Sequence, residues 1–166
     1  VRVYPKHPSC RIHSHRYPLL PMYHRGYPIR INMDEQNTLD LYMEYIQAFE
    51  SKDYHTIADQ CRTPFFASSP SGTTIFGNRE ELLEGFSLLR NSLDIDGYVG
   101  SKLNQLDFMR VAETAGTLLV DFHRINHEGN PYFHGKALYI FQRDAQKTMI
   151  IGIVVLDDST TSSWND

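Results

Sequence analysis

The sequence has no run of 18 apolar residues, and its mean hydropathy is −0.41. A helix that crosses a membrane needs about 20 consecutive apolar residues, so no membrane segment is expected. The length of 166 residues, with 41% hydrophobic and 22% charged side chains, instead predicts one globular domain.

Cysteine is nearly absent, since the chain contains only Cys10 and Cys61. Two distant cysteines supply neither a disulfide framework nor the ligand spacing of a metal site. Cys61 falls on an apolar helical stripe and is interpreted as a small core residue. This cysteine usage is typical of a reducing compartment, and we expect a cytoplasmic protein.

Motifs for common cofactors are also missing. The chain has no glycine-rich phosphate loop, no Ser-His-Asp order and no recognisable cysteine nucleophile. A metal site built from His123, His127 and His134 is not expected, because the four-residue spacing of the first two suits a helix and they fall on a predicted strand. We therefore expect neither a cofactor nor a metal.

Acidic residues are missing from residues 1–32, which carry six basic residues, five prolines and four histidines. The remainder then holds 10 Lys+Arg against 20 Asp+Glu, a net charge of −10. A body of that charge repels phosphate backbones, so we expect no nucleic-acid binding by the main domain.

Residues 1–32 show no helical or strand periodicity and are predicted to be a non-globular basic arm. Three interpretations remain open: upstream sequence read through from an over-extended start before Met33, a disordered arm that contacts nucleic acid or a membrane surface, or a targeting segment. We expect the domain to span residues 33–158 and residues 159–166 to form a polar tail.

Hydrophobic periodicity predicts three helices. Residues 38–51 carry apolar side chains at three-and-four spacing, with Asn37 as the expected cap. A short second helix is expected to follow Asp53 and to end before Pro64. The third follows Asn78, and its apolar stripe consists of Leu82, Leu83, Phe86, Leu89 and Leu93.

The other segments are predicted to be strands. Residues 65–69 and 73–76 flank a Pro-Ser-Gly turn, and four longer runs follow at residues 102–112, 115–127, 131–143 and 147–157. The short links favour an antiparallel meander. The predicted class is α+β, with one curved antiparallel sheet packed around three N-terminal helices.

The order of these elements resembles that of the nuclear transport factor 2-like (NTF2-like) superfamily, which includes ketosteroid isomerase, SnoaL-like polyketide cyclases, scytalone dehydratase and limonene epoxide hydrolase. The resemblance covers about residues 36–158. The segments that carry it are YIQAFESKDYHTIADQC, FFASSPSGTTIFGNREELLEGF, GTLLVDFHRI and ALYIFQRDAQKTMIIGIVVLD. It implies a cone-shaped single domain with a pocket at its open mouth.

The resemblance also implies a homodimer formed through the outer face of the sheet. The last strand is apolar on both faces, as expected if one face covers the helices and the other a partner. The alternative is a sheet whose outer face is apolar without any partner.

Against the ketosteroid isomerase pattern, the oxyanion-binding tyrosine falls on Tyr45 and is retained. The general-base aspartate falls on Ser69, before Pro70, and the second oxyanion donor falls near Ala137. A serine does not shuttle a proton between two carbons at neutral pH. Steroid isomerisation by that mechanism is therefore not expected.

The isomerase alignment places the odd-numbered residues of strand 115–127 in the pocket, among them Asp121 and His123. On that reading Asp121 is the base, His123 the acid or orienting partner, and Tyr45 the hydrogen-bond donor. Two alternatives remain: the pair satisfies its own polar groups as a structural plug, or a bulge reverses the faces. The resemblance to limonene epoxide hydrolase is the weaker one, because this chain has Asp121-x-His123 where that enzyme has Arg-x-Asp.

The predicted ligand-binding wall consists of Phe65, Ser69, Phe86 and Tyr139. The predicted function is binding of a small apolar or carbonyl-containing molecule, with cofactor-free isomerase, cyclase or dehydratase activity by proton transfer. The alternative is a non-catalytic ligand-binding or dimerisation module of the same fold.

Overall fold

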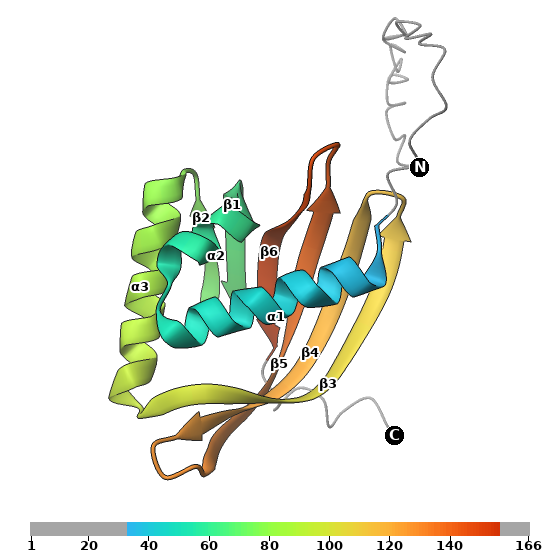
Figure 1. Ribbon diagram of the computed structural model, residues 1–166. Coiled ribbons are helices and arrows are strands. Elements are labelled where there is room, and N and C mark those ends of the chain that lie inside the picture. Colours follow the sequence, from blue (N-terminus) through green and yellow to red (C-terminus); the bar gives the residue numbers. More distant parts are fainter. Residues whose placement is uncertain (1–32, 157–166) are drawn as a thin grey trace, which may run out of the picture.

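The computed structural model describes residues 33–156, so the predicted arm (1–32) and tail (159–166) lie outside the described residues. Three helices and a hairpin precede four long strands, as Figure 1 shows. The elements in order are α1 (Glu35–Ser51), α2 (Tyr54–Gln60), β1 (Cys61–Ser69), β2 (Gly72–Phe76), α3 (Arg79–Ile95), β3 (Tyr98–Ala112), β4 (Ala115–Asn126), β5 (Pro131–Arg143) and β6 (Thr148–Leu156).

The strands form one sheet in the order β2-β1-β6-β5-β4-β3. All neighbours are antiparallel except β1 and β6, which run parallel. The sheet is curved, and α1 lies across its inner face while α3 stands beside the β1–β2 hairpin (Figure 1). The predicted α+β class, with a curved sheet around three N-terminal helices in a single cone-shaped domain, is confirmed. The sheet was predicted to be antiparallel, and the parallel β1–β6 pair is the exception.

Side-chain caps fix where the helices begin. Helix α1 begins one turn earlier than predicted, because Asp34 accepts the hydrogen bond from the Asn37 backbone N–H at 2.9 Å. Asn37 is therefore not the cap but a residue of the first turn. Asp53 and Asn78 cap α2 and α3 as predicted, and the Asn78 Oδ1 accepts from the Glu81 N–H at 3.0 Å.

A bulge in β6 decides which of its apolar residues face the helices. Ile150 pairs with Phe141 and Gly152 with Ile140, which leaves Ile151 as an extra residue. Ile150 and Ile153 are therefore both buried on the inner side, although strict alternation would separate them. The sequence predicted apolar residues on each face of this strand by strict alternation. That alternation would have put Ile150 and Ile153 on opposite faces, and the bulge puts them on the same one.

The core lies between the inner face of the sheet and the helices. Its fully buried side chains come from every layer and include Tyr42, Ile57, Phe65, Leu82, Leu118, Val120, Phe141 and Ile150.

Among residues 33–156, no helix has both the length and the apolar composition needed to cross a bilayer.

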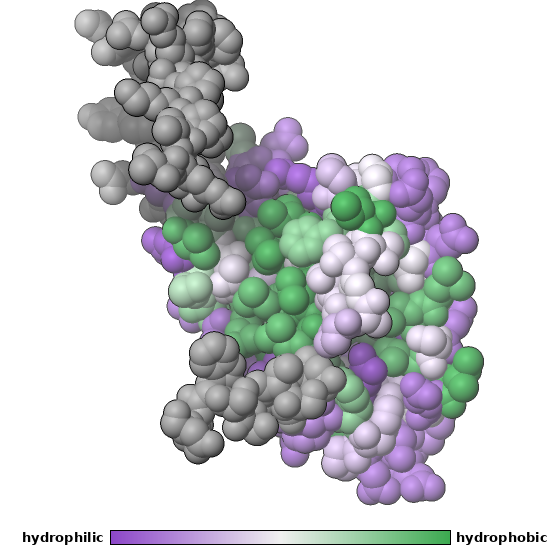
Figure 2. Space-filling view, turned by 180° about the vertical axis from the view of Figure 1, so that it is seen from behind, coloured by the Kyte–Doolittle hydropathy of each residue, from purple (hydrophilic) through white to green (hydrophobic). Residues whose placement is uncertain are grey.

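The opposite face of the sheet carries an apolar patch, which Figure 2 shows from behind. Alternation from the buried inner residues assigns to it Phe66, Leu119, Leu138, Ile140 and Val154, all half-buried, and we call this set the outer-face patch. The Phe66 ring lies directly over Gly152, where a Cβ would meet it at 2.2 Å.

Candidate functional site

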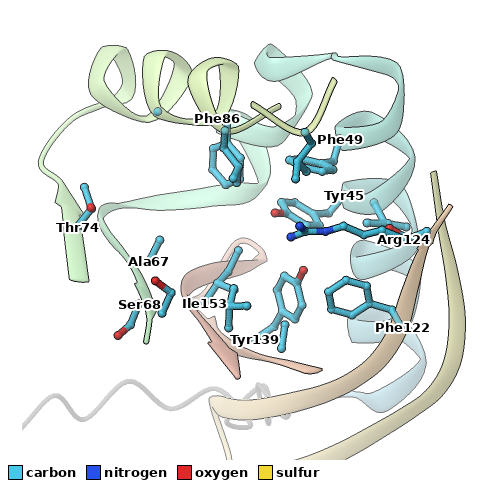
Figure 3. Close-up of a pocket in the computed structure, with 18 of the residues that line it drawn as sticks. Tyr45, Phe49, Ala67, Ser68, Thr74, Phe86, Phe122, Arg124, Tyr139 and Ile153 are labelled. Atoms are coloured by element: carbon cyan, nitrogen blue, oxygen red, sulfur yellow. The ribbon is translucent and has the colours of Figure 1, made fainter. Parts of the chain in front are cut away.

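A cavity of about 490 Å³ lies between α1, α3, the β1–β2 hairpin and the inner face of the sheet. Its inner wall is aromatic and includes Tyr42, Tyr45, Phe49, Phe86, Phe122 and Tyr139 (Figure 3). Hydroxyl groups of the hairpin contribute a second part of the wall, from Ser68, Ser69, Ser71, Thr73 and Thr74. The cavity is therefore mainly apolar, with hydroxyl groups on the hairpin side.

Three tyrosines from two elements meet in this wall. The ring of Tyr139 on β5 packs edge-on against Tyr42 and Tyr45 of α1, with centroids 4.9 and 5.6 Å apart. Burial is the main cause that raises the pKa of all three hydroxyls; the nearby Tyr139 raises the pKa of Tyr42 and Tyr45 further, whereas these two neighbours partly lower that of Tyr139. At neutral pH they are therefore protonated phenols that can donate hydrogen bonds.

One charged side chain, Arg124 of β4, lines the cavity among the described residues. It points into the cavity in Figure 3. Its guanidinium carbon lies over the ring of the cross-strand neighbour Phe133, 4.4 Å from the centroid. No carboxylate within residues 33–156 forms an ion pair with it.

Four of the predicted site residues line this cavity: Tyr45, Ser69, Phe86 and Tyr139. Ser69 lies on the hairpin, where its hydroxyl is 2.7 Å from that of Ser71. Phe65 was predicted to line it as well, but it is fully buried, with its ring packed on Phe76 and Phe86. Phe65 therefore supports the wall from behind, and Ala67 takes the lining position on the same face of β1.

Asp121 and His123 do not line the cavity, so the predicted orientation of β4 was wrong. The even-numbered residues face inward instead: Leu118 and Val120 are fully buried, and Phe122 lines the cavity. Burial of these apolar side chains decides which face of β4 points toward the helices. Because side chains alternate along a strand, the odd-numbered residues then lie on the outer face. Of the alternatives, the one in which Asp121 and His123 face away from the pocket agrees with the structure.

On the outer face, Asp121 and His123 belong to a polar cluster. The His134 Nε2 and the Asn104 Nδ2 lie 2.9 and 2.7 Å from the same Asp121 carboxylate oxygen. Asn104 is also 2.8 Å from the His123 Nδ1, and the two imidazoles stack with centroids 4.5 Å apart. The Asn104 hydrogen bond is the main cause that lowers the pKa of Asp121, and His134 and Lys136 lower it further.

This cluster is not a candidate metal centre, because no group of three suitable ligands occurs in the described part of the chain. Its position at one side of the apolar outer face gives that face a charged border.

Sequence reasoning missed Arg124, Phe122 and Tyr42 as lining residues. Tyr42 could have been found, since it lies one helical turn before Tyr45 on the same stripe. For β4 the signal was ambiguous, because Leu118, Leu119 and Val120 are consecutive apolar residues that fit either alternation.

The sequence matches the model of a family described as NTF2-like protein (DUF6841) over residues 34–158. No curated protein matches the sequence.

Solved structures of similar fold include an NTF2-like protein with a cystatin-like fold from Novosphingobium aromaticivorans, 12% identical, with a TM-score of 0.64 over 78% of this chain and 84% of that chain. An NTF2-like protein of unknown function from Pseudomonas putida is also 12% identical, with a TM-score of 0.60 over 74% and 84%. The beta subunit of the benzoate 1,2-dioxygenase from Burkholderia mallei is 11% identical, with a TM-score of 0.59 over 75% and 91%. At these identities the likeness concerns the fold alone.

Proposed function

Because the chain belongs to the NTF2-like family DUF6841, whose model spans residues 34–158, we propose that it is a small-molecule-binding protein whose ligand occupies the cavity between α1, α3 and the sheet. The observation that carries this proposal is the cavity itself. Its volume of about 490 Å³ falls within the range of roughly 300–1,000 Å³ typical of ligand pockets.

The wall has the composition that small-molecule sites share, which is mostly aromatic and aliphatic with a few convergent polar groups. The hydroxyls of Tyr42, Tyr45 and Tyr139 and the guanidinium of Arg124 supply those polar groups. An apolar ligand that fills the space would remove the faces of Phe86 and Phe122 from water, which favours binding.

The proposal is binding rather than isomerase, cyclase or dehydratase chemistry. Proton transfer at neutral pH needs a base whose pKa lies near the working pH. Within residues 33–156, the cavity wall contains no carboxylate and no imidazole, and its tyrosines are held in the protonated form by burial. Asp121 and His123, which the sequence favoured for this role, lie on the outer face.

The test uses the neutral fluorescent probe N-phenyl-1-naphthylamine, whose emission rises when it enters an apolar site. We expect saturable binding to the wild-type protein. Ala137→Phe places a ring in the cavity wall and should abolish that binding. Leu138→Phe, at the neighbouring position on the other face of the same strand, is the matched control and should bind the probe normally.

Two results would contradict the proposal: no saturable binding by the folded wild-type protein, or equal binding by wild type and Ala137→Phe. Circular dichroism melting of each variant shows whether it is folded at the assay temperature.

We also propose that two copies of the chain pair through the outer-face patch. Its support is a contiguous set of apolar side chains on a sheet face that no helix covers in the described part of the chain (Figure 2). The cytoplasmic location stays a prediction from cysteine usage.

A further inference from the structure

We propose that the ligand of this cavity is an organic anion, whose carboxylate or similar acidic group binds Arg124 while its apolar body lies among the aromatic side chains. This inference rests on the proposed function and adds the chemical class of the ligand. It follows from the charge balance of the cavity, the orientation of one guanidinium group and the donor character of the wall.

The charge balance is the first step. Two arginines lie near Tyr98, which is itself part of the wall. Arg90 stacks on the Tyr98 ring at 4.6 Å and forms an ion pair with Asp94, so its charge is compensated within the protein. Arg124 has no such partner among residues 33–156.

Glu50 lies in the same region of the sheet, and its charge contributes, after burial, to the raised pKa of Tyr42 and Tyr98. It forms no ion pair with Arg124. Its Oε1 accepts a hydrogen bond of 2.7 Å from the backbone N–H of Ser101, the residue that pairs with Arg124 across β3 and β4. Arg124 therefore has no ion-pair partner within residues 33–156, and it lies half-buried at the wall of a cavity that no other charged side chain of these residues lines. A partly buried charge without a partner is costly, and an anionic ligand would remove that cost.

The orientation of Arg124 is the second step. Its guanidinium carbon lies 4.4 Å from the centroid of the Phe133 ring, so an aromatic face covers one side of the group. The N–H donors of a guanidinium lie in its plane, and a ring over its face leaves them available. The side chain is directed into the cavity (Figure 3), where these donors match the two oxygens of a carboxylate.

The donor character of the wall is the third step. Burial raises the pKa of Tyr42, Tyr45 and Tyr139, so each keeps its hydroxyl proton at neutral pH. Together with Arg124 they make this part of the wall rich in donors, and no ionised acceptor lines the cavity within the described residues. A ligand with an acceptor-rich, negatively charged group therefore complements it better than a cation or a donor-rich molecule does.

The experiment compares two probes of nearly identical shape, 2-naphthoate and its neutral amide 2-naphthamide, by calorimetric titration of the full chain near neutral pH. A carboxylate held by charge-assisted hydrogen bonds should bind roughly tenfold or more tightly than the amide. Arg124→Gln should remove this preference, because the affinity for 2-naphthoate falls much more than the affinity for 2-naphthamide does. Arg110→Gln removes the same charge from an exposed position of β3 outside the cavity and should keep the preference.

The outcomes separate this inference from the proposed function. If wild type binds the amide as tightly as the carboxylate, and Ala137→Phe abolishes both, the binding function stands and the anionic ligand class is wrong. If neither probe binds to the folded protein, the proposed function fails and the inference fails with it.

A variant that keeps the charge guards against loss of folding. Arg124→Lys retains a cation but lacks the planar fork, and it should keep only part of the preference for 2-naphthoate. If Arg124→Gln does not fold, the wild-type ratio and the Lys variant decide. The inference would be overturned if the wild-type protein bound 2-naphthoate and 2-naphthamide with equal affinity and Arg124→Lys did the same.

Discussion

The carboxylate of Asp121 and the guanidinium of Arg124 come from the same strand but lie on opposite faces of the sheet. Asp121 belongs to the outer polar cluster with His134 and Asn104, whereas Arg124 lines the cavity. The strand thus separates an acid with hydrogen-bond partners on the outer face from a cation without an ion-pair partner, within the described residues, on the cavity side.

The first prediction concerns the pH dependence of stability at Asp121. Its hydrogen bonds lower its pKa in the folded state. The resulting stabilisation is present above the unfolded aspartate pKa of about 3.9 and is lost as the pH falls through the lower folded value. Asp121→Asn should therefore lower the free energy of unfolding by about 1 kcal/mol at neutral pH, and by less in acid.

Urea unfolding of wild type and Asp121→Asn across this pH range measures the difference. Asp107→Asn, an exposed aspartate on the outer face of the neighbouring strand, is the control and should show little change. A deficit for Asp121→Asn that stayed constant from neutral to acid pH would contradict the lowered pKa.

The second prediction concerns the three cavity tyrosines. Since burial raises the pKa of Tyr42, Tyr45 and Tyr139, they stabilise the fold fully below the unfolded tyrosine pKa of about 10, and this contribution is lost as the pH rises above it. Ultraviolet absorbance should show that these three of the ten tyrosines ionise only together with alkaline unfolding. Reversible ionisation of all ten in the folded protein near pH 10 would be the contrary result.

The third prediction concerns the outer-face patch. Leu138→Lys places a charge in the middle of that patch and should convert a dimer to a monomer, because an unpaired buried charge is strongly unfavourable at an interface. Sedimentation velocity measures the change. Leu88→Lys introduces the same charge at an exposed apolar residue of α3, away from the sheet face that carries the patch, and should leave the dimer intact. A wild-type protein that is monomeric at high concentration would rule out the proposed pairing.

The fourth prediction links a glycine to the position of Arg124. A Cβ at Gly135 would meet the ring of Phe133 at 2.5 Å, so Gly135→Ala must displace that ring. Phe133 covers one side of the Arg124 guanidinium. We expect a stability loss of about 1 kcal/mol and a clear reduction in the preference for 2-naphthoate over 2-naphthamide.

Gly116→Ala provides the comparison for this variant. A Cβ at Gly116 would also meet a ring, that of Phe108 at 2.8 Å, but neither Gly116 nor Phe108 lines the cavity. It should lower stability without altering the preference. An unaltered preference in folded Gly135→Ala would show that Phe133 does not position Arg124.

The sequence predicted the elements well because their signals are local. Caps such as Asp53 and Asn78 act within one or two turns, and the structure places them as expected. Cys61, which was predicted on a helical stripe, is instead the first residue of β1. The start of α1 was missed because two suitable caps, Asp34 and Asn37, lie three residues apart. Nothing local distinguishes them when the residues between them are good helix formers.

The candidate site was less predictable because it depends on the facing of one strand. Tyr45 and Tyr139 were found, but the identity of the inward set on β4 follows from which side chains the helices bury. That is a tertiary property, and three consecutive apolar residues erased the alternation that would have revealed it. The bulge at Ile151 in β6 has the same origin, since only pairing with β5 exposes it.

The parallel pairing of β1 with β6 bears on the order in which the chain can fold. It joins Cys61 to Ile150, and within residues 33–156 the other strand partner of β1 is β2 of its own hairpin. The β1–β2 hairpin therefore cannot join the sheet until β6 has been synthesised, whereas α1 and α3 can already contact β3. Such late, non-local pairing slows folding, and it leaves the apolar side chains of β1, such as Phe65, without their sheet neighbours until the last strand is available.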